Sequence, residues 1–160
     1  GKVFGGWVLN ADGTDIAYKD KSQYPADESR TLYARWLGVS RLLGYDPDYS
    51  YPDSKNDGER SLFNRKMKAF VMASGKTITK ILFKAGQIQP ASITDDMRVS
   101  IDGCEYPAWL TVENNDTLVI NTDGDRFAAD SRSECMFCGH SYDESEYMKI
   151  YSLFSLSDKS

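Results

Sequence analysis

The stretch that decides the fold class reads Leu32-Tyr33-Ala34-Arg35-Trp36-Leu37-Gly38-Val39-Ser40-Arg41. Its apolar side chains recur at the spacing of one helical face, and the same stripe continues to Leu43. Asp27 or Ser29 can cap the start of such a helix, and Gly44 suits the left-handed residue that ends one. The pattern therefore predicts an amphipathic helix from about Asp27 to Leu43.

Upstream of this stretch the sequence indicates a β-hairpin. Apolar runs at residues 3–9 and 15–18 flank a polar turn at residues 10–14, which contains the dipeptide Asp12-Gly13. An Asp-Gly pair between two apolar runs is a strong short-range hairpin signal.

Downstream, helical periodicity returns over residues 59–73 and predicts a second amphipathic helix, which Ser74-Gly75 would end. Residues 77–83 fit either a helix or a strand, because their apolar spacing suits the first and their β-branched residues suit the second. Strands are then expected at 97–101, 105–112, 117–121 and 147–156. The fold class predicted is α+β: an N-terminal β-hairpin, two amphipathic helices and an antiparallel β-meander, in a single domain over residues 1–160.

Composition limits the classes of protein that this chain can belong to. A hydrophobic content of 41% and an aromatic content of 12% are enough for a packed core. The formal net charge of −5 disfavours generic binding to nucleic acid or to anionic membranes. Because no run of 18 apolar residues exists, no membrane span and no membrane partner are expected. The odd number of cysteines indicates reduced thiols, and hence a cytoplasmic location.

Soft metal ligands gather in the motif Cys135-Met136-Phe137-Cys138-Gly139-His140. A two-residue spacer lets both thiolates face one point, and the glycine permits the tight turn of a zinc knuckle. With Cys104 as the fourth ligand, the chain could form a Cys3His zinc site from Cys104, Cys135, Cys138 and His140. The alternatives are a pair of reduced thiols without metal, or a redox-active Cys-x-x-Cys.

Positive charge is concentrated in the middle of the chain. Seven basic residues and one acidic residue fall between Glu59 and Ala85 in a chain that is acidic overall. This segment could contact an acidic partner protein, bind the phosphates of a nucleic acid, or be a solvated surface. The candidate partner-binding residues are the basic side chains Arg60, Arg65, Lys68, Lys76, Lys80 and Lys84 and the tyrosines Tyr45, Tyr49 and Tyr51.

The string Ala34-x-x-Leu37-Gly38-Val39-Ser40-Arg41 resembles the first helix and turn of a helix-turn-helix DNA-binding motif. The resemblance covers about eight residues and then ends. Gly44 stands where the motif has a buried aliphatic residue, and Pro47 interrupts the recognition helix. An uninterrupted amphipathic helix explains the same residues.

No catalytic signature is apparent, since the only histidine belongs to the Cys/His cluster. The function expected is that of a non-catalytic binding protein, such as an inhibitor, adaptor or accessory factor, which acts through protein–protein contacts. One alternative is a nucleic-acid-binding regulator that uses the basic segment 60–84. A second alternative is a carboxylate-based hydrolase, which the abundant acidic residues leave open.

Overall fold

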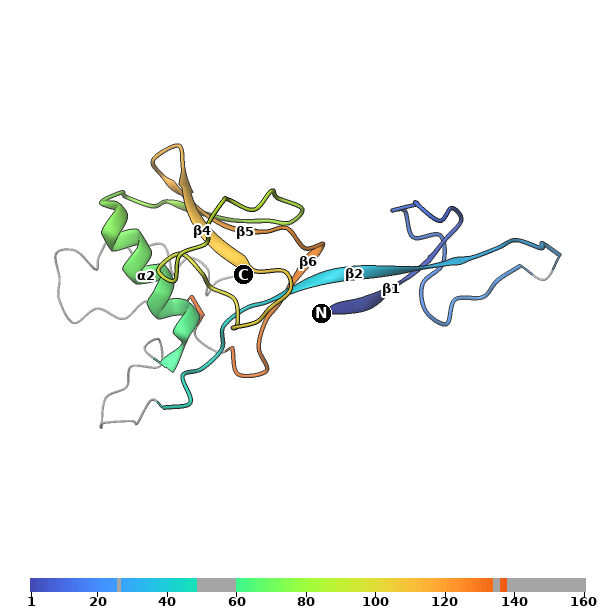
Figure 1. The fold of residues 1–160 in the computed structure, drawn as a ribbon, viewed down its shortest axis with the longest axis horizontal. Coiled ribbons are helices and arrows are strands. Elements are labelled where there is room, and N and C mark those ends of the chain that lie inside the picture. The colour runs from blue at the N-terminus through green and yellow to red at the C-terminus, as the bar shows by residue number, and fades with distance from the viewer. Residues whose placement is uncertain (26, 49–59, 134–135, 138–160) are drawn as a thin grey trace.

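The computed structural model describes residues 1–25, 27–48, 60–133 and 136–137. Within this part of the chain, strands dominate, and they form two three-stranded sheets beside one helix, α2. The first sheet has the order β1-β2-β6 and the second the order β3-β5-β4. Figure 1 shows the β1–β2 ribbon projecting to one side of a body that contains α2 and the second sheet.

The prediction of an α+β fold with two helices is wrong, because the described residues are mostly β. The predicted helix over residues 27–43 is instead β2, a strand spanning Tyr33–Arg41. Its apolar residues fall at helical spacing, but Tyr33, Trp36 and Val39 are aromatic and β-branched types that favour strands. The partner strand β1, Lys2–Val8, supplies the hydrogen bonds that decide in favour of a strand.

The N-terminal hairpin is also corrected. Its first strand is present as β1, but β1 pairs antiparallel with the distant β2. The predicted return strand at 15–18 makes only a bridge between Tyr18 and Trp7, where the Trp7 N–H donates to the Tyr18 carbonyl at 2.8 Å. The turn between them exists, since the Gly13 N–H donates to the Asn10 carbonyl at 2.9 Å.

The second predicted helix is present as α2, Leu62–Ser74. The hydroxyl of Ser61 caps its start by accepting from the Asn64 N–H at 3.1 Å. Gly75 ends it in the left-handed conformation, with φ of 63°. The apolar face of α2 buries Phe63 and Met67 completely.

The second sheet contains the best-predicted strands. β4, Ala108–Glu113, and β5, Thr117–Thr122, form a hairpin whose turn residues Asn114 and Asn115 both have positive φ. That backbone geometry suits asparagine better than most residues. The ambiguous segment 77–83 resolves as the strand β3, Lys80–Lys84, which runs parallel to β5. The expected antiparallel meander is therefore a mixed sheet.

Two further strand predictions have different outcomes. Residues 97–101 make only isolated bridges, one between Arg98 and Trp109 and one between Ser100 and Leu42. The strand predicted at 147–156 lies outside the described residues. A short strand that was not predicted, β6 at Arg126–Ala128, runs parallel to the end of β2 and joins the ribbon to the body.

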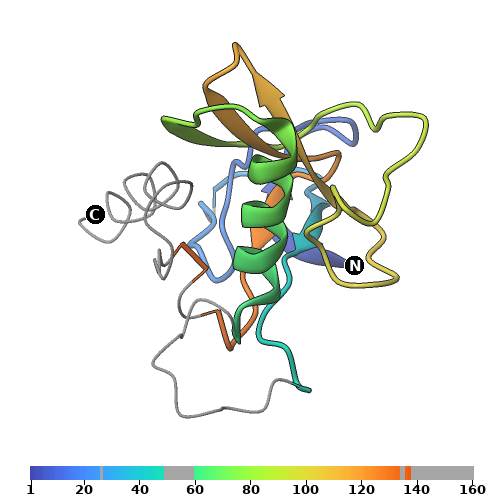
Figure 2. The ribbon, with the colours of Figure 1, turned by 90° about the vertical axis from the view of Figure 1, so that its left-hand side faces the viewer.

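The hydrophobic core lies between α2 and the second sheet (Figure 2). Phe63 and Met67 of α2 pack with Leu110, Leu118 and Ile120, all fully buried. Among the described helices, none combines the length and the apolar character needed to cross a membrane.

Candidate interaction surfaces

The projecting ribbon is formed by β1 and β2, and we call it the arm. Its antiparallel register places Val3 opposite Leu37, Phe4 opposite Trp36 and Trp7 opposite Ala34. A bulge between Phe4 and Gly6 accommodates one extra residue in β1. Because side chains alternate across a strand, the register divides the arm into two faces of different character.

One face of the arm is covered by the chain that follows β1. Val8 on this face is only 1% exposed. A side chain at Gly6 would collide with the side chain of Ile16 and with the carbonyl of Tyr18, which shows how closely that segment lies on β1. Gly6 also has φ of 134°, a conformation that side chains other than glycine rarely adopt. The segment around residues 16–18 therefore serves as a local cover for this face.

The opposite face carries an open aromatic cluster made of Phe4, Trp7 and Trp36. The Phe4 ring lies 5.2 Å from the Trp7 ring and 5.7 Å from the Trp36 ring, both in edge-to-face arrangements. Trp36 is 54% exposed and Trp7 is 36% exposed. Three clustered rings with this much exposed surface are typical of a contact site.

Sequence reasoning missed this cluster because it assigned Trp36 to the buried stripe of a helix. Phe4 and Trp7 were assigned to a hairpin strand without regard to a second strand opposite them. The aromatic and β-branched residues Tyr33, Trp36 and Val39 favour a strand, but the face that Trp36 shares with Phe4 is defined only once that strand is known to pair with β1.

The base of the arm is held by Asp125, just before β6. Its carboxylate accepts a hydrogen bond of 2.6 Å from the Gly38 N–H and another of 3.1 Å from the Arg35 guanidinium. The Asp125 N–H donates in turn to the Gly38 carbonyl at 2.8 Å. At the same place the ring of Tyr106 lies where a side chain at position 38 would be, so glycine allows the close approach. These contacts set the direction in which the arm leaves the body.

Several predicted contact residues in the basic segment interact within the protein. Arg65 pairs with Asp46, and Lys84 donates to Glu113 at 2.8 Å. The guanidinium carbon of Arg60 lies 4.4 Å from the centre of the Tyr45 ring, in a cation–π contact. These intramolecular contacts weaken the case for one continuous phosphate-binding surface.

The remaining predicted contact residues differ in their settings. Lys68 is half-buried on α2, whereas Lys76 and Lys80 are exposed. Asn64, which the helical periodicity places on one stripe with Arg60 and Lys68, is fully buried, so that stripe faces the protein. Tyr49 and Tyr51 lie outside the described residues.

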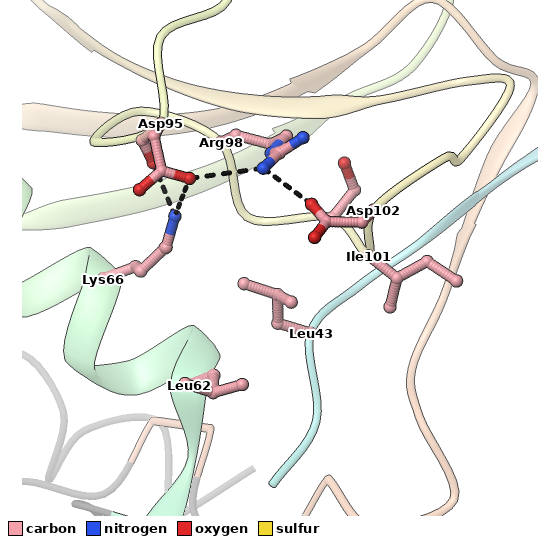
Figure 3. Close-up of a pocket in the computed structure, with 8 residues that line it drawn as sticks. Leu43, Leu62, Lys66, Asp95, Arg98, Ile101 and Asp102 are labelled. Carbon is pink, nitrogen blue, oxygen red and sulfur yellow. Dashed lines mark hydrogen bonds and ion pairs between the residues drawn. The ribbon is translucent and has the colours of Figure 1, made fainter. Parts of the chain in front are cut away.

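A shallow pocket between α2 and the loop at 94–102 contains a chain of ion pairs (Figure 3). Lys66 lies 3.1 Å from the Asp95 carboxylate, and Arg98 bridges Asp95 and Asp102 at 3.2 and 2.6 Å. The hydrogen bond from Lys66 is the main reason why the pKa of Asp95 is lowered from its ordinary value. Because each charge in the pocket faces an opposite one, the network is best explained as a link between the helix and the loop.

A second carboxyl group with a shifted pKa is that of Asp46. The backbone N–H of Asp48, followed by the guanidinium of Arg65, lowers its pKa. A carboxylate-based hydrolase needs one carboxyl with a raised pKa to act as the acid. The shifts of Asp46 and Asp95 run in the opposite direction, so neither group suits that role.

The predicted zinc ligands fall mostly outside the described part of the chain. Cys135, Cys138 and His140 lie outside the described residues, so the Cys3His site stays a prediction. Cys104 is half-buried, and its thiol lies 3.3 Å from the Tyr106 carbonyl and 3.4 Å from the Arg41 N–H. Within residues 1–25, 27–48, 60–133 and 136–137, no three histidine, cysteine or acidic side chains converge as metal ligands.

Comparison with known proteins does not assign this chain to a family. No protein-family model, curated protein or solved structure matches it. The features that bear on function are therefore the surfaces that the fold presents, above all the open face of the arm.

Proposed function

We propose that this chain is a non-catalytic binding protein, such as an inhibitor, adaptor or accessory factor, that contacts another protein through its arm. The observation that carries the proposal is the exposed cluster of Phe4, Trp7 and Trp36 on the open face of the β1–β2 ribbon. The odd number of cysteines, three in the whole chain, supports action in a reducing compartment such as the cytoplasm.

Binding through these rings would be driven by the apolar surface that a partner removes from water. An aromatic side chain buries about 150–250 Å² when fully covered, and apolar burial contributes roughly 25 cal/mol per Å². Tryptophan is among the residue types most enriched at the energetic centres of protein interfaces. The strand pairing already orders Trp36 and Trp7, so less conformational entropy is lost when a partner covers them.

The arrangement of the arm favours a separate protein as the occupant of this face. A ribbon that projects from the body can enter a groove of a partner, and its covered face keeps the ribbon in shape while the open face makes contact (Figure 1). Lys2 lies on the same face as Phe4 and adds a charge at the margin of the cluster. Such marginal charges steer association more than they add affinity.

The test compares affinity purification from the native cells with wild-type chain, Trp36→Ser and the control Ile88→Ser. Ile88 is 95% exposed and lies off the arm, so its substitution removes an exposed apolar residue from a different surface. A protein recovered with wild type and Ile88→Ser should be lost with Trp36→Ser. With that partner purified, Trp36→Ser should raise Kd by at least tenfold.

Two results would overturn the proposal. One is a partner that binds Trp36→Ser as tightly as it binds the wild type. The other is turnover of a small molecule by the purified chain with no recoverable partner. If sedimentation instead shows concentration-dependent dimers that Trp36→Ser abolishes, the occupant of the arm is a second copy and the proposed partner is wrong.

A further inference from the structure

The strand β3 has an unpaired edge in the described part of the chain, because it is the outermost strand of the sheet β3-β5-β4. The Lys80 N–H donates toward β5, to the Asp116 carbonyl at 3.2 Å. Since successive residues of a strand direct their N–H and C=O groups to opposite sides, those of Ile81 and Phe83 point away from β5. This edge thus offers two donors and two acceptors to an incoming strand.

The middle of this edge is apolar and firmly held. Leu82 is 45% exposed and Phe83 is 46% exposed. The Phe83 ring nevertheless packs edge to face against Phe127 at 5.2 Å and Phe137 at 6.2 Å. The strand is therefore a fixed template with a partly uncovered apolar surface.

The ends of the strand carry positive charge. Lys80 is exposed, as is Lys76 four residues earlier, and neither side chain forms an ion pair with another described residue. Lys84 at the other end is bound to Glu113. Lysines on an edge strand oppose pairing between copies, because antiparallel self-pairing about Leu82 would set Lys80 of one chain opposite Lys84 of the other. The exposed charge of Lys80 attracts a strand with an acidic residue opposite it.

We propose that the free edge of β3 binds an extended acidic–apolar segment of a partner protein by strand addition. Backbone hydrogen bonds to Ile81 and Phe83 would supply the pairing, an apolar side chain would cover Leu82, and an acidic side chain would face Lys80. This surface is separate from the aromatic cluster of the arm. A negative result at the β3 edge would therefore leave the function proposed for the arm unaffected, and a negative result at the arm would leave the β3 edge unaffected.

The test titrates the full chain with a synthetic peptide, acetyl-Ser-Glu-Thr-Val-Thr-Glu-Ser-amide, and follows backbone amides by NMR. The matched peptide has lysine in place of both glutamates, and a third peptide is N-methylated at alternate backbone amides. The acidic peptide should shift the amides of Ile81 and Phe83 and bind at least tenfold tighter than the lysine peptide. N-methylation should abolish binding because it removes donors that strand pairing needs.

Charge reversal then tests the contact with Lys80. Lys80→Glu should weaken binding of the acidic peptide by at least fivefold and strengthen that of the lysine peptide, whereas Lys2→Glu on the arm should change neither. If Lys80→Glu melts at a lower temperature than the wild type, salt can replace the variant as the test of charge. Raising the salt concentration should weaken binding of the acidic peptide to the wild-type chain and should not weaken binding of the lysine peptide. Equal affinity for both peptides, shifts located on the arm, or no binding at millimolar peptide would overturn the proposal.

Discussion

The arm and the body use the same kinds of side chain in opposite ways. In the body, the apolar residues of β4 and β5 are enclosed by α2, and Leu110, Leu118 and Ile120 have no exposed surface. In the arm, the described residues cover one face, and Trp36 on the other face is 54% exposed. The difference indicates that exposed tryptophans are a property of the arm and do not reflect a shortage of core-forming residues.

The two regions also differ in what holds them. The body is stabilised by a shared core, so the loss of one side chain affects every element that contacts it. The arm depends on strand pairing, on the local cover from residues 16–18 and on the contacts of Asp125 at its base. We therefore expect the body to unfold cooperatively, whereas the arm can be loosened by itself.

The largest expected effect is that of Phe63→Ala. Phe63 is fully buried in the core, and its truncation should lower the free energy of unfolding by about 3–5 kcal/mol. The matched change on the arm, Trp36→Ala, should cost clearly less, about 1 kcal/mol, because the ring is 54% exposed and loses an edge-to-face contact with Phe4. Urea unfolding followed by circular dichroism measures both. Similar losses for the two variants would contradict the distinction between core and arm.

A smaller effect is expected for Asp125→Ala at the base of the arm. The substitution removes a charged acceptor from the Gly38 N–H and from Arg35, contacts worth about 1.5–3 kcal/mol when formed to a charged group. Hydrogen exchange should become faster at the amide of Gly38 and stay unchanged at those of Leu118 and Ile120. The control is Asp12→Ala, on an exposed turn. Faster exchange throughout the body would show that the arm is not an independent unit.

The helix cap provides a third comparison. Ser61→Ala removes the acceptor of the Asn64 N–H at the start of α2 and should cost about 1 kcal/mol of stability. The loss should appear in global unfolding, because α2 is part of the core. Ser92→Ala, at an exposed loop position, should have no measurable effect in the same urea titration.

The smallest effect concerns pH. The pKa of Asp46 is lowered in the folded protein, so the folded state favours the ionised carboxylate. Its contribution is complete at neutral pH and is lost as the pH falls below about 4 toward the folded pKa. Asp46→Asn should therefore be less stable than the wild type at pH 7 by under about 1 kcal/mol, since the pair with Arg65 is partly exposed. The difference should shrink as the pH falls below about 4 in urea titrations, and a difference that stays constant with pH would exclude this cause.

The sequence alone identified the parts of this fold whose signals are local. The helix α2 follows from its apolar periodicity and from Gly75 after it, although its predicted start at residue 59 precedes the observed start at Leu62. The β4–β5 hairpin follows from two apolar runs around Asn114 and Asn115, whose backbone conformation only a few residue types adopt easily.

Tertiary structure decided what local signals leave open. Residues 33–41 have the apolar spacing of a helix, and the pairing with β1 made them β2 instead and brought Trp36 beside Phe4. The parallel pairing of β3 with β5 likewise left Ile81 and Phe83 at an edge that no other described strand covers. Strand pairing determines which side chains share a face and which backbone groups lie at an edge. Both candidate contact surfaces could therefore be identified only when the pairing of distant segments was known.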